Sequence, residues 1–89
     1  MTKEELDLLS VRVKLFASSR EIIGKNEIIL RLKNRTTVGD LRRMILEMYP
    51  ALSSKKIPFV IAVNHKVIDD STIVGHLDEV AILPPVSGG

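Results

Sequence analysis

The apolar residues of this chain follow a helical spacing in only one place. From Val38 to Met48 they recur three and four residues apart, which predicts a single main helix with one apolar stripe. Elsewhere the apolar residues alternate or form a short run, as they do in strands. One helix covers only one face of a sheet, so we predict an α+β domain whose other sheet face is free to meet a partner. Strands are expected at 10–16, 27–33, 59–63, 66–68 and 79–83.

Local signals place the helix ends. Thr37-x-x-Asp40 predicts a cap at the start of the main helix, and Pro50 disfavours helical geometry at Tyr49 and ends it. Ser18-x-x-Glu21 predicts a capped second helical turn that Gly24 stops in a left-handed conformation. The apolar stripe of the main helix comprises Val38, Leu41, Ile45 and Met48, with Arg42, Arg43 and Glu47 facing water, and Ile22 and Ile23 point inward from the short turn.

The last third of the domain is expected to be a hairpin, a loop and a strand. Asn64-His65 predicts a two-residue turn, because asparagine tolerates a positive φ. Residues 69–78 are expected to form a loop with one helical turn at 72–74. On the last strand, Val80 and Ile82 point to the helix if Ala81 and Leu83 point away.

The chain finishes with Pro84-Pro85-Val86-Ser87-Gly88-Gly89. The two prolines hold φ near one value and donate no backbone N–H, so this segment leaves the sheet as a semi-rigid arm that reaches about 20 Å. A carboxylate on glycine has no side chain beside it and can enter a narrow slot. We therefore predict a body at 10–83, an extended functional tail at 84–89 with Gly89 as the reacting end, and a frayed N-terminal extension at 1–9. Ser87 is interpreted as a small spacer.

Composition excludes several kinds of site. The chain has no cysteine, which rules out disulfides, thiolate metal sites and a cysteine nucleophile. Its net charge is +2 with both signs interleaved, so we predict no nucleic-acid partner. The N-terminus is too acidic for a signal peptide and no apolar stretch is long enough for a membrane span, so we expect a cytoplasmic location.

Polar residues of the loop do not make a site by their spacing. His65, Asp69, Asp70, His76 and Asp78 lack the intervals typical of metal ligands, so no metal is predicted. The chain also lacks a Gly-x-x-x-x-Gly-Lys phosphate loop and a nucleophile–base pair. We expect it not to be catalytic alone.

Three segments carry a resemblance to a known family. Val13-Lys14-Leu15-Phe16-Ala17, Ala62-Val63-Asn64 and the run from Asp78 to Gly89 resemble the small subunits of molybdopterin synthase, the MoaD-type branch of the ubiquitin-like sulfur carriers. The resemblance implies a ubiquitin-like β-grasp fold, a mixed sheet with its first and last strands side by side in the centre. Leu77 stands where relatives usually carry glycine, so either the turn differs or Leu77 takes an unusual backbone angle.

The same resemblance implies a function. An E1-like activating enzyme would use ATP to adenylate Gly89, and sulfur would replace AMP to leave a C-terminal thiocarboxylate. The thiocarboxylate would donate sulfur to a cyclic pyranopterin precursor in the large subunit, in a heterotetramer of two small and two large subunits. The chain itself would bind no cofactor, and the glycyl-adenylate and thiocarboxylate would be its covalent forms. Leu83 and Val67 fall where the small subunit packs against the large one, although Val67 could instead fill the core beneath its hairpin.

Two other functions fit the same residues. With the fold unchanged, the chain could be a ubiquitin-like protein modifier, or a sulfur carrier for thiazole synthesis or tRNA thiolation. It could also be a plain binding module whose tail is incidental.

Overall fold

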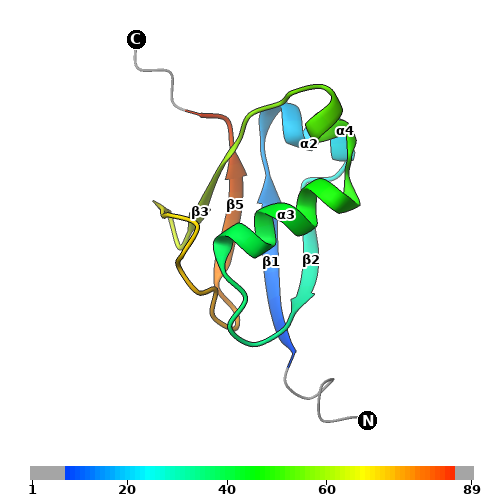
Figure 1. Cartoon of the computed structure of the whole chain (residues 1–89). Helices are drawn as coiled ribbons and strands as arrows, with labels where there is room; N and C mark the ends of the chain where they lie inside the picture. The colour runs from blue at the N-terminus through cyan, green and yellow to red at the C-terminus, as the bar shows by residue number, and fades with distance from the viewer. Residues whose placement is uncertain (1–7, 86–89) are drawn as a thin grey trace.

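The computed structural model describes residues 8–85, which form one five-stranded mixed sheet with helices packed against it (Figure 1). The strand order is β2-β1-β5-β3-β4; β1 and β5 are parallel neighbours in the centre, and the other pairs are antiparallel. This confirms the predicted α+β architecture. The elements are β1 (Leu9–Leu15), α2 (Ala17–Ile23), β2 (Glu27–Leu32), α3 (Val38–Met48), α4 (Ala51–Ser54), β3 (Val60–Val63), β4 (Lys66–Val67) and β5 (Glu79–Leu83).

Alternation along the strands separates the two faces of the sheet. Val13 of β1 pairs with Ile28 of β2 and with Val80 of β5, and all three side chains are buried. Their neighbours in sequence point to the opposite face, as the period of two requires. The prediction that Val80 and Ile82 point inward while Ala81 and Leu83 point away is confirmed by the burial of the first two.

The main helix α3 begins with a complete capping box. Thr37 Oγ1 accepts from the Asp40 N–H at 3.1 Å, and the Asp40 carboxylate accepts from the Thr37 N–H at 3.2 Å. These two bonds confirm the predicted cap, and the one from the Thr37 N–H is the main cause of a lowered pKa of the Asp40 carboxyl. Val38 and Ile45 are fully buried, as is Leu41.

The prediction for Met48 was wrong, because its side chain is 48% exposed. After α3 ends, the chain turns at Pro50 into the short helix α4, which the sequence did not predict. Leu52 of α4 is 1% exposed and completes the core near this end of α3. Met48 is therefore not needed to fill the core.

The capping prediction for the short helix was also wrong. α2 begins at Ala17, and Ser18 lies within it without capping the helix end. Ser19 is the buried serine, and its hydroxyl donates to the Phe16 carbonyl at 2.8 Å. The prediction for Gly24 is confirmed: it ends the helix at φ +80°, and its N–H donates to the Arg20 carbonyl at 2.8 Å.

The hairpin after β3 has the predicted two-residue turn. Asn64 and His65 have φ of 51° and 71°, the pair of positive angles that a type I′ turn requires. The expected helical turn at 72–74 is absent from the structure. Ile73 instead bridges to Thr37, and the Val74 N–H donates to the Thr36 carbonyl, because this segment runs beside the start of α3.

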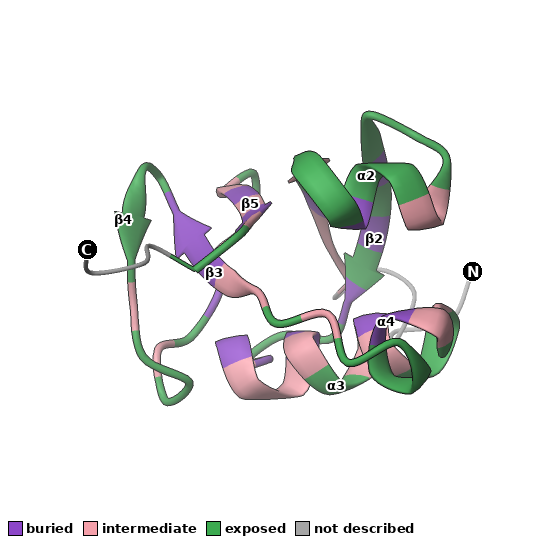
Figure 2. Cartoon of the chain, turned by 90° about the horizontal axis from the view of Figure 1, so that it is seen from above, coloured by how far each residue is buried: buried purple, intermediate pink, exposed green. Residues whose placement is uncertain are grey.

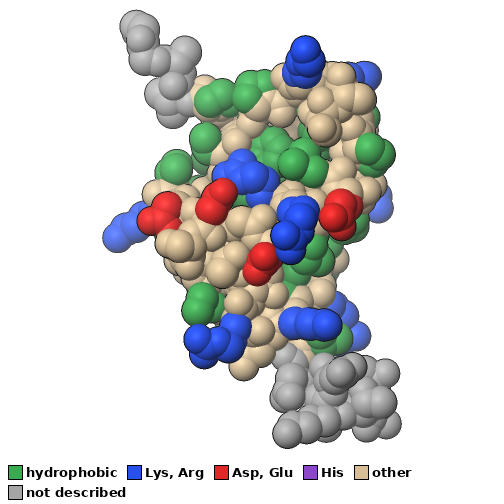
Figure 3. All heavy atoms as spheres, in the orientation of Figure 1, with side chains coloured by type: hydrophobic (Ala, Val, Ile, Leu, Met, Phe, Trp, Pro, Cys, Tyr) green, Lys and Arg blue, Asp and Glu red, His purple; other side chains and the backbone are tan. Residues whose placement is uncertain are grey.

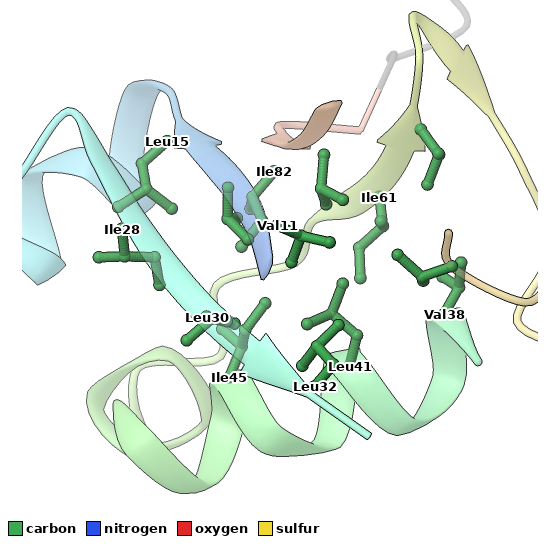
Figure 4. Packing of buried hydrophobic residues seen from close by; sticks show 14 of the residues in the cluster. Val11, Leu15, Ile28, Leu30, Leu32, Val38, Leu41, Ile45, Ile61 and Ile82 are labelled. Atoms are coloured by element: carbon green, nitrogen blue, oxygen red, sulfur yellow. The ribbon is translucent and has the colours of Figure 1, made fainter. Parts of the chain in front are cut away.

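The helices α3 and α4 lie on the same side of the sheet (Figure 2). The apolar core fills the space between α3 and the strands (Figure 4). On the side of the molecule that carries α3, basic and acidic side chains are interspersed (Figure 3). The fully buried large side chains are Val11, Val13, Leu15, Leu32, Val38, Leu41, Ile45, Leu52, Ile61, Val74, Val80 and Ile82.

The N-terminal boundary differs slightly from the prediction. β1 begins at Leu9, inside the expected extension, where Leu9 pairs with Leu32 and packs against the core. Residues 1–7 of that extension lie outside the described residues. Within residues 8–85, no helix has the length and apolar character needed to span a membrane.

Candidate functional site: the open sheet face and the base of the tail

An apolar patch occupies the sheet face opposite α3. Cross-strand pairing brings its members together, because Ala62 is paired with both Val67 and Ala81 and paired residues point to the same side. Together with polar neighbours they line a hollow of about 280 Å³. We call this group the open-face patch; its residues are Phe16, Ala62, Val67, Ala81 and Leu83.

Both predicted partner-binding residues lie on the open-face patch. Val67 is 63% exposed, so the interpretation that it fills the core beneath its hairpin is excluded. Leu83 is half-buried at the end of β5, where it pairs with Val60. Both side chains are thus placed where a partner that covers this face would touch them.

Sequence analysis missed Phe16 and Ala62. Phe16, which is 40% exposed, follows Arg12 and Lys14 in the outward-facing series of β1, so the alternation of that strand could have identified it. Ala62 lay inside a continuous apolar run, so no alternation of apolar and polar residues indicated which face it occupies. Its assignment to the open face depends on the register of β3 against β5.

Polar side chains border the patch. Lys14 and His65 both contact the carboxylate of Glu79, with His65 Nε2 lying 3.4 Å from it. The hydrogen bond from Lys14 is the main reason that the pKa of Glu79 lies below its ordinary value, and the charge of Lys14 adds to it. Glu79 is therefore ionised at neutral pH, and the patch has a polar rim of the kind found around protein interfaces.

The tail leaves the sheet at a defined rung of the β3–β5 ladder. The Asn64 N–H donates to the Glu79 carbonyl at 2.7 Å, and hydrogen-bonded pairs alternate along antiparallel strands. Counting in steps of two, Val60–Leu83 is such a pair and Pro58–Pro85 would be the next. Neither proline has an N–H to donate, so the ladder stops at Leu83 and the chain departs.

A second hollow, of about 150 Å³, lies beside the base of the tail. Phe16 and Leu83 line it along with the predicted tail residues Pro84 and Pro85, which are exposed. The start of the tail is thus next to the open-face patch. The remaining predicted tail residues, Val86, Ser87, Gly88 and the reacting end Gly89, lie outside the described residues.

The unusual angle considered for Leu77 is present. Leu77 has φ +66° with its side chain 76% exposed, and its N–H donates to the Ser10 carbonyl at 3.1 Å. The Asp78 carboxylate accepts from the Gly75 N–H at 2.6 Å and so closes the turn that contains Leu77. The turn keeps a conformation suited to glycine although a leucine occupies it.

The acidic and histidine residues of the loop take part in local bonds. Asp69 accepts from the Ser71 hydroxyl and from the Ser71 N–H, which lowers the pKa of its carboxyl, and His76 accepts from the Ser10 N–H at 3.2 Å. Among residues 8–85, no group of three such side chains is placed to hold a metal ion.

Comparison with known proteins defines the class. The family model described as the ThiS family matches residues 13–89, and the chain belongs to this family. A ubiquitin from Caldiarchaeum subterraneum, 17% identical with a TM-score of 0.61 over 92% of this chain and 99% of that one, shares the fold. The predicted ubiquitin-like β-grasp fold is confirmed.

Particular relatives are similar over nearly their whole length. The chain is 36% identical to the molybdopterin synthase sulfur carrier subunit of Arabidopsis thaliana, covering 100% of this chain and 96% of that protein. It is 38% identical to the subunit of the same name from Dictyostelium discoideum, covering 88% of this chain and 94% of the relative. The predicted family resemblance is thereby confirmed.

Two solved structures bear on partners and on alternatives. SAMP1, the small archaeal modifier protein 1 from Haloferax volcanii, has a TM-score of 0.75 and 28% identity, covering 90% of this chain and 99% of that chain. A chain of the complex of subunits 1 and 2 of the molybdopterin-converting factor from Helicobacter pylori has a TM-score of 0.63 and 27% identity, covering 91% of this chain and 100% of that one.

Proposed function

We propose that this chain is the sulfur-carrier small subunit of a molybdopterin synthase and acts in the cytoplasm. The observation that carries the proposal is the 36% identity, over the whole chain, to a relative of that name. The described structure supports it in one further way. The last strand ends beside an uncovered apolar patch, and the chain continues from there as Pro84-Pro85 toward Gly89.

The chemistry begins with activation, because a carboxylate is a poor acyl electrophile. In the active site of an E1-like enzyme, a carboxylate oxygen of Gly89 attacks the α-phosphorus of ATP, and pyrophosphate leaves. A sulfide-level nucleophile then attacks the carbonyl carbon of the glycyl-adenylate, and AMP leaves with the carboxylate oxygen. The product is a C-terminal thiocarboxylate on Gly89, which is a far better nucleophile than the carboxylate. The chain itself contributes the acyl group and binds no cofactor.

The thiocarboxylate is then used in the large subunit. Its sulfur forms a C–S bond with a carbon of the cyclic pyranopterin precursor as the C–O bond at that carbon breaks, which leaves the carrier joined to the precursor as a thioester. Water then attacks the thioester carbonyl, the sulfur leaves as a thiolate on the product, and the Gly89 carboxylate is restored. Two rounds supply the two dithiolene sulfurs of molybdopterin. Two small and two large subunits would form the synthase.

Docking on the large subunit is assigned to the open-face patch. Leu83 and Val67 present apolar side chains on this face, and the Lys14–Glu79 pair borders them. Because Leu83 also lines the hollow at the base of the tail, a partner that covers the patch would receive the tail beside its contact surface. The complex of subunits 1 and 2 from Helicobacter pylori, which contains a chain of similar fold, supports a partner of this kind.

Reconstitution tests the proposal. The chain is incubated with its E1-like activating enzyme, ATP and sulfide, and mass spectrometry of the intact chain should show the exchange of one oxygen for sulfur. Addition of the large subunit and the pyranopterin precursor should then yield molybdopterin. A variant lacking Gly88 and Gly89 should bind the large subunit and transfer no sulfur. Sulfur transfer by that truncated chain would contradict the proposal and favour a binding module with an incidental tail.

A second candidate is a ubiquitin-like protein modifier, which the similarity to SAMP1 favours. In that case the activated Gly89 would be joined to a lysine side chain of a target protein by an isopeptide bond. Recovery of such conjugates from cells that express a tagged chain would support this function. Sulfur delivery to thiazole or tRNA would appear in the reconstitution as thiocarboxylate formation without molybdopterin synthesis.

A further inference from the structure

Arg42 on α3 joins three segments that are far apart in the sequence. Its Nη1 donates to the Phe59 carbonyl at 3.1 Å, and its Nη2 donates to Asp70 Oδ1, also at 3.1 Å. The guanidinium also lies over the Phe59 ring, 5.2 Å from its centroid. The Arg42 side chain is 30% exposed, so these contacts are partly shielded from water. Sequence analysis assigned Arg42 to the solvent, and the structure corrects that assignment.

The Phe59 carbonyl accepts its hydrogen bond from Arg42 and not from a neighbouring strand. The alternation that makes Val60–Leu83 a hydrogen-bonded pair directs the Phe59 carbonyl away from β5. On that other side β3 is paired with β4 only at Ala62 and Val63. Arg42 therefore takes the place of a neighbouring strand at this position. A planar guanidinium can make both hydrogen bonds and stack on the ring at once, which an ammonium cannot do.

The segment 57–59 stands between Arg42 and the base of the tail. On one side it lines a hollow shared with Arg42 and Leu46. On the other side it lines the hollow shared with Pro84 and Pro85. The β3–β5 pairing ends at Val60 and Leu83, so Phe59 and Pro58 directly precede it and Pro84 and Pro85 directly follow it, around the same hollow. Whatever holds Phe59 thus sets the wall along which the tail departs.

We propose that Arg42 is a positioning residue for the tail, which it directs by holding Phe59 and Pro58 against the first two tail residues. The proposal rests on the proposed carrier function, because direction matters only if Gly89 must enter another enzyme's active site. Arg42 is not on the open-face patch, so docking should not depend on it. Its loss should reduce the fraction of docked carriers whose Gly89 carboxylate is in place to attack ATP.

The test compares two Arg42 variants in the activation assay. Arg42→Met keeps an apolar stem over the ring and removes both donors, whereas Arg42→Lys keeps the charge but has one nitrogen in place of the planar fork that reaches Phe59 and Asp70. We expect Arg42→Met to lower kcat for thiocarboxylate formation about fivefold while KM for the carrier changes less than about twofold. The kcat of Arg42→Lys should lie between those of Arg42→Met and the wild-type chain. Affinity for the large subunit, measured by calorimetry, should stay unchanged in both variants.

A matched control separates positioning from stability. Asp40→Ala removes the half of the capping box that the Asp40 carboxylate supplies to the same helix, together with its ion pair to Arg43, without touching Phe59, so it should lower the melting temperature and leave kcat unchanged. Circular dichroism confirms that all variants are folded at the assay temperature. Equal decreases in kcat for Arg42→Met and Asp40→Ala would overturn the inference. It would also be overturned if Arg42→Met kept the wild-type kcat or changed only KM. A wild-type chain that forms no thiocarboxylate would overturn the carrier function itself and this inference with it.

Discussion

Leu83 pairs with Val60 in the last hydrogen-bonded rung of the β3–β5 ladder, and the two residues that follow β5 are prolines. One residue therefore belongs to the sheet, to the open-face patch and to the hollow at the base of the tail. A partner that contacts Leu83 is thereby brought next to the tail without any further docking element. The predictions below follow from this arrangement and from the contacts around it.

A charge at Leu83 should weaken docking without unfolding the chain. Leu83→Glu places a carboxylate in an apolar interface, and we expect affinity for the large subunit to fall by at least about 30-fold, or about 2 kcal/mol. Calorimetric titration measures the change. Met48→Glu is the matched control, because Met48 is an exposed apolar residue on α3, away from the patch. Equal losses in the two variants would show that the open-face patch is not the docking surface.

Truncation of Ile82 should affect stability, whereas truncation of Val67 should affect binding. Ile82 is fully buried, so Ile82→Ala should lower the free energy of unfolding by about 2–4 kcal/mol, whereas exposed Val67→Ala should change it by less than about 0.5 kcal/mol. Urea unfolding gives both values. Val67→Ala should instead weaken binding to the large subunit. A large loss of stability in Val67→Ala would contradict the placement of this side chain on the open face.

Acid should remove the stabilising effect of Glu79. Its hydrogen bond with Lys14 holds the pKa of the folded carboxyl below the ordinary value of 4.5. A group with a lowered folded pKa stabilises the fold above its unfolded pKa, and this effect is lost as pH falls through the folded pKa. Wild type should therefore be more stable than Glu79→Gln at neutral pH, and the difference should shrink below pH 4.5.

The carboxyl of Glu79 can also be followed directly. In an NMR titration, Lys14→Met should move the pKa of Glu79 back toward 4.5, because the first cause of the shift has been removed. An unchanged pKa in Lys14→Met would show that another contact holds the carboxylate.

Replacement of Leu77 by glycine should stabilise the chain. Leu77 has φ +66°, and its side chain is 76% exposed, so glycine relieves strain and loses little packing. We expect Leu77→Gly to raise the free energy of unfolding by about 0.5–1 kcal/mol. At Gly24, which has φ +80° and open space around it, the reverse change Gly24→Ala should lower the free energy by about 1 kcal/mol. Thermal unfolding of the two variants should give shifts of opposite sign, and shifts of the same sign would refute the strain at Leu77.

Features that depend on neighbours in sequence were predictable. The alternation of Val11, Val13 and Leu15 assigned the inner face of β1, and the Thr37–Asp40 pair located the start of α3. Gly24 and the Asn64-His65 turn followed from the φ angles that these residues tolerate. The family resemblance supplied the central pairing of β1 with β5, which periodicity alone did not reveal.

Other features were decided by tertiary structure. Leu52 is buried in the core where Met48 was expected, because α4 folds beside α3. Ile73 bridges to Thr37 because the loop passes the start of α3. Phe16 and Ala62 joined the open-face patch because β5 pairs with β1 on one side and with β3 on the other, and β3 pairs in turn with β4.

Sequence by itself determined which faces of the strands are apolar, where the main helix begins and where the two-residue hairpin turn lies. Only the tertiary structure decided that Leu83, Val67 and Phe16 share one surface and that Arg42 holds Phe59 beside the tail. The physical reason is the range of the forces involved. Periodicity and turn preferences act within a few residues, whereas strand register and the Arg42 bonds join residues that only the folded chain brings together.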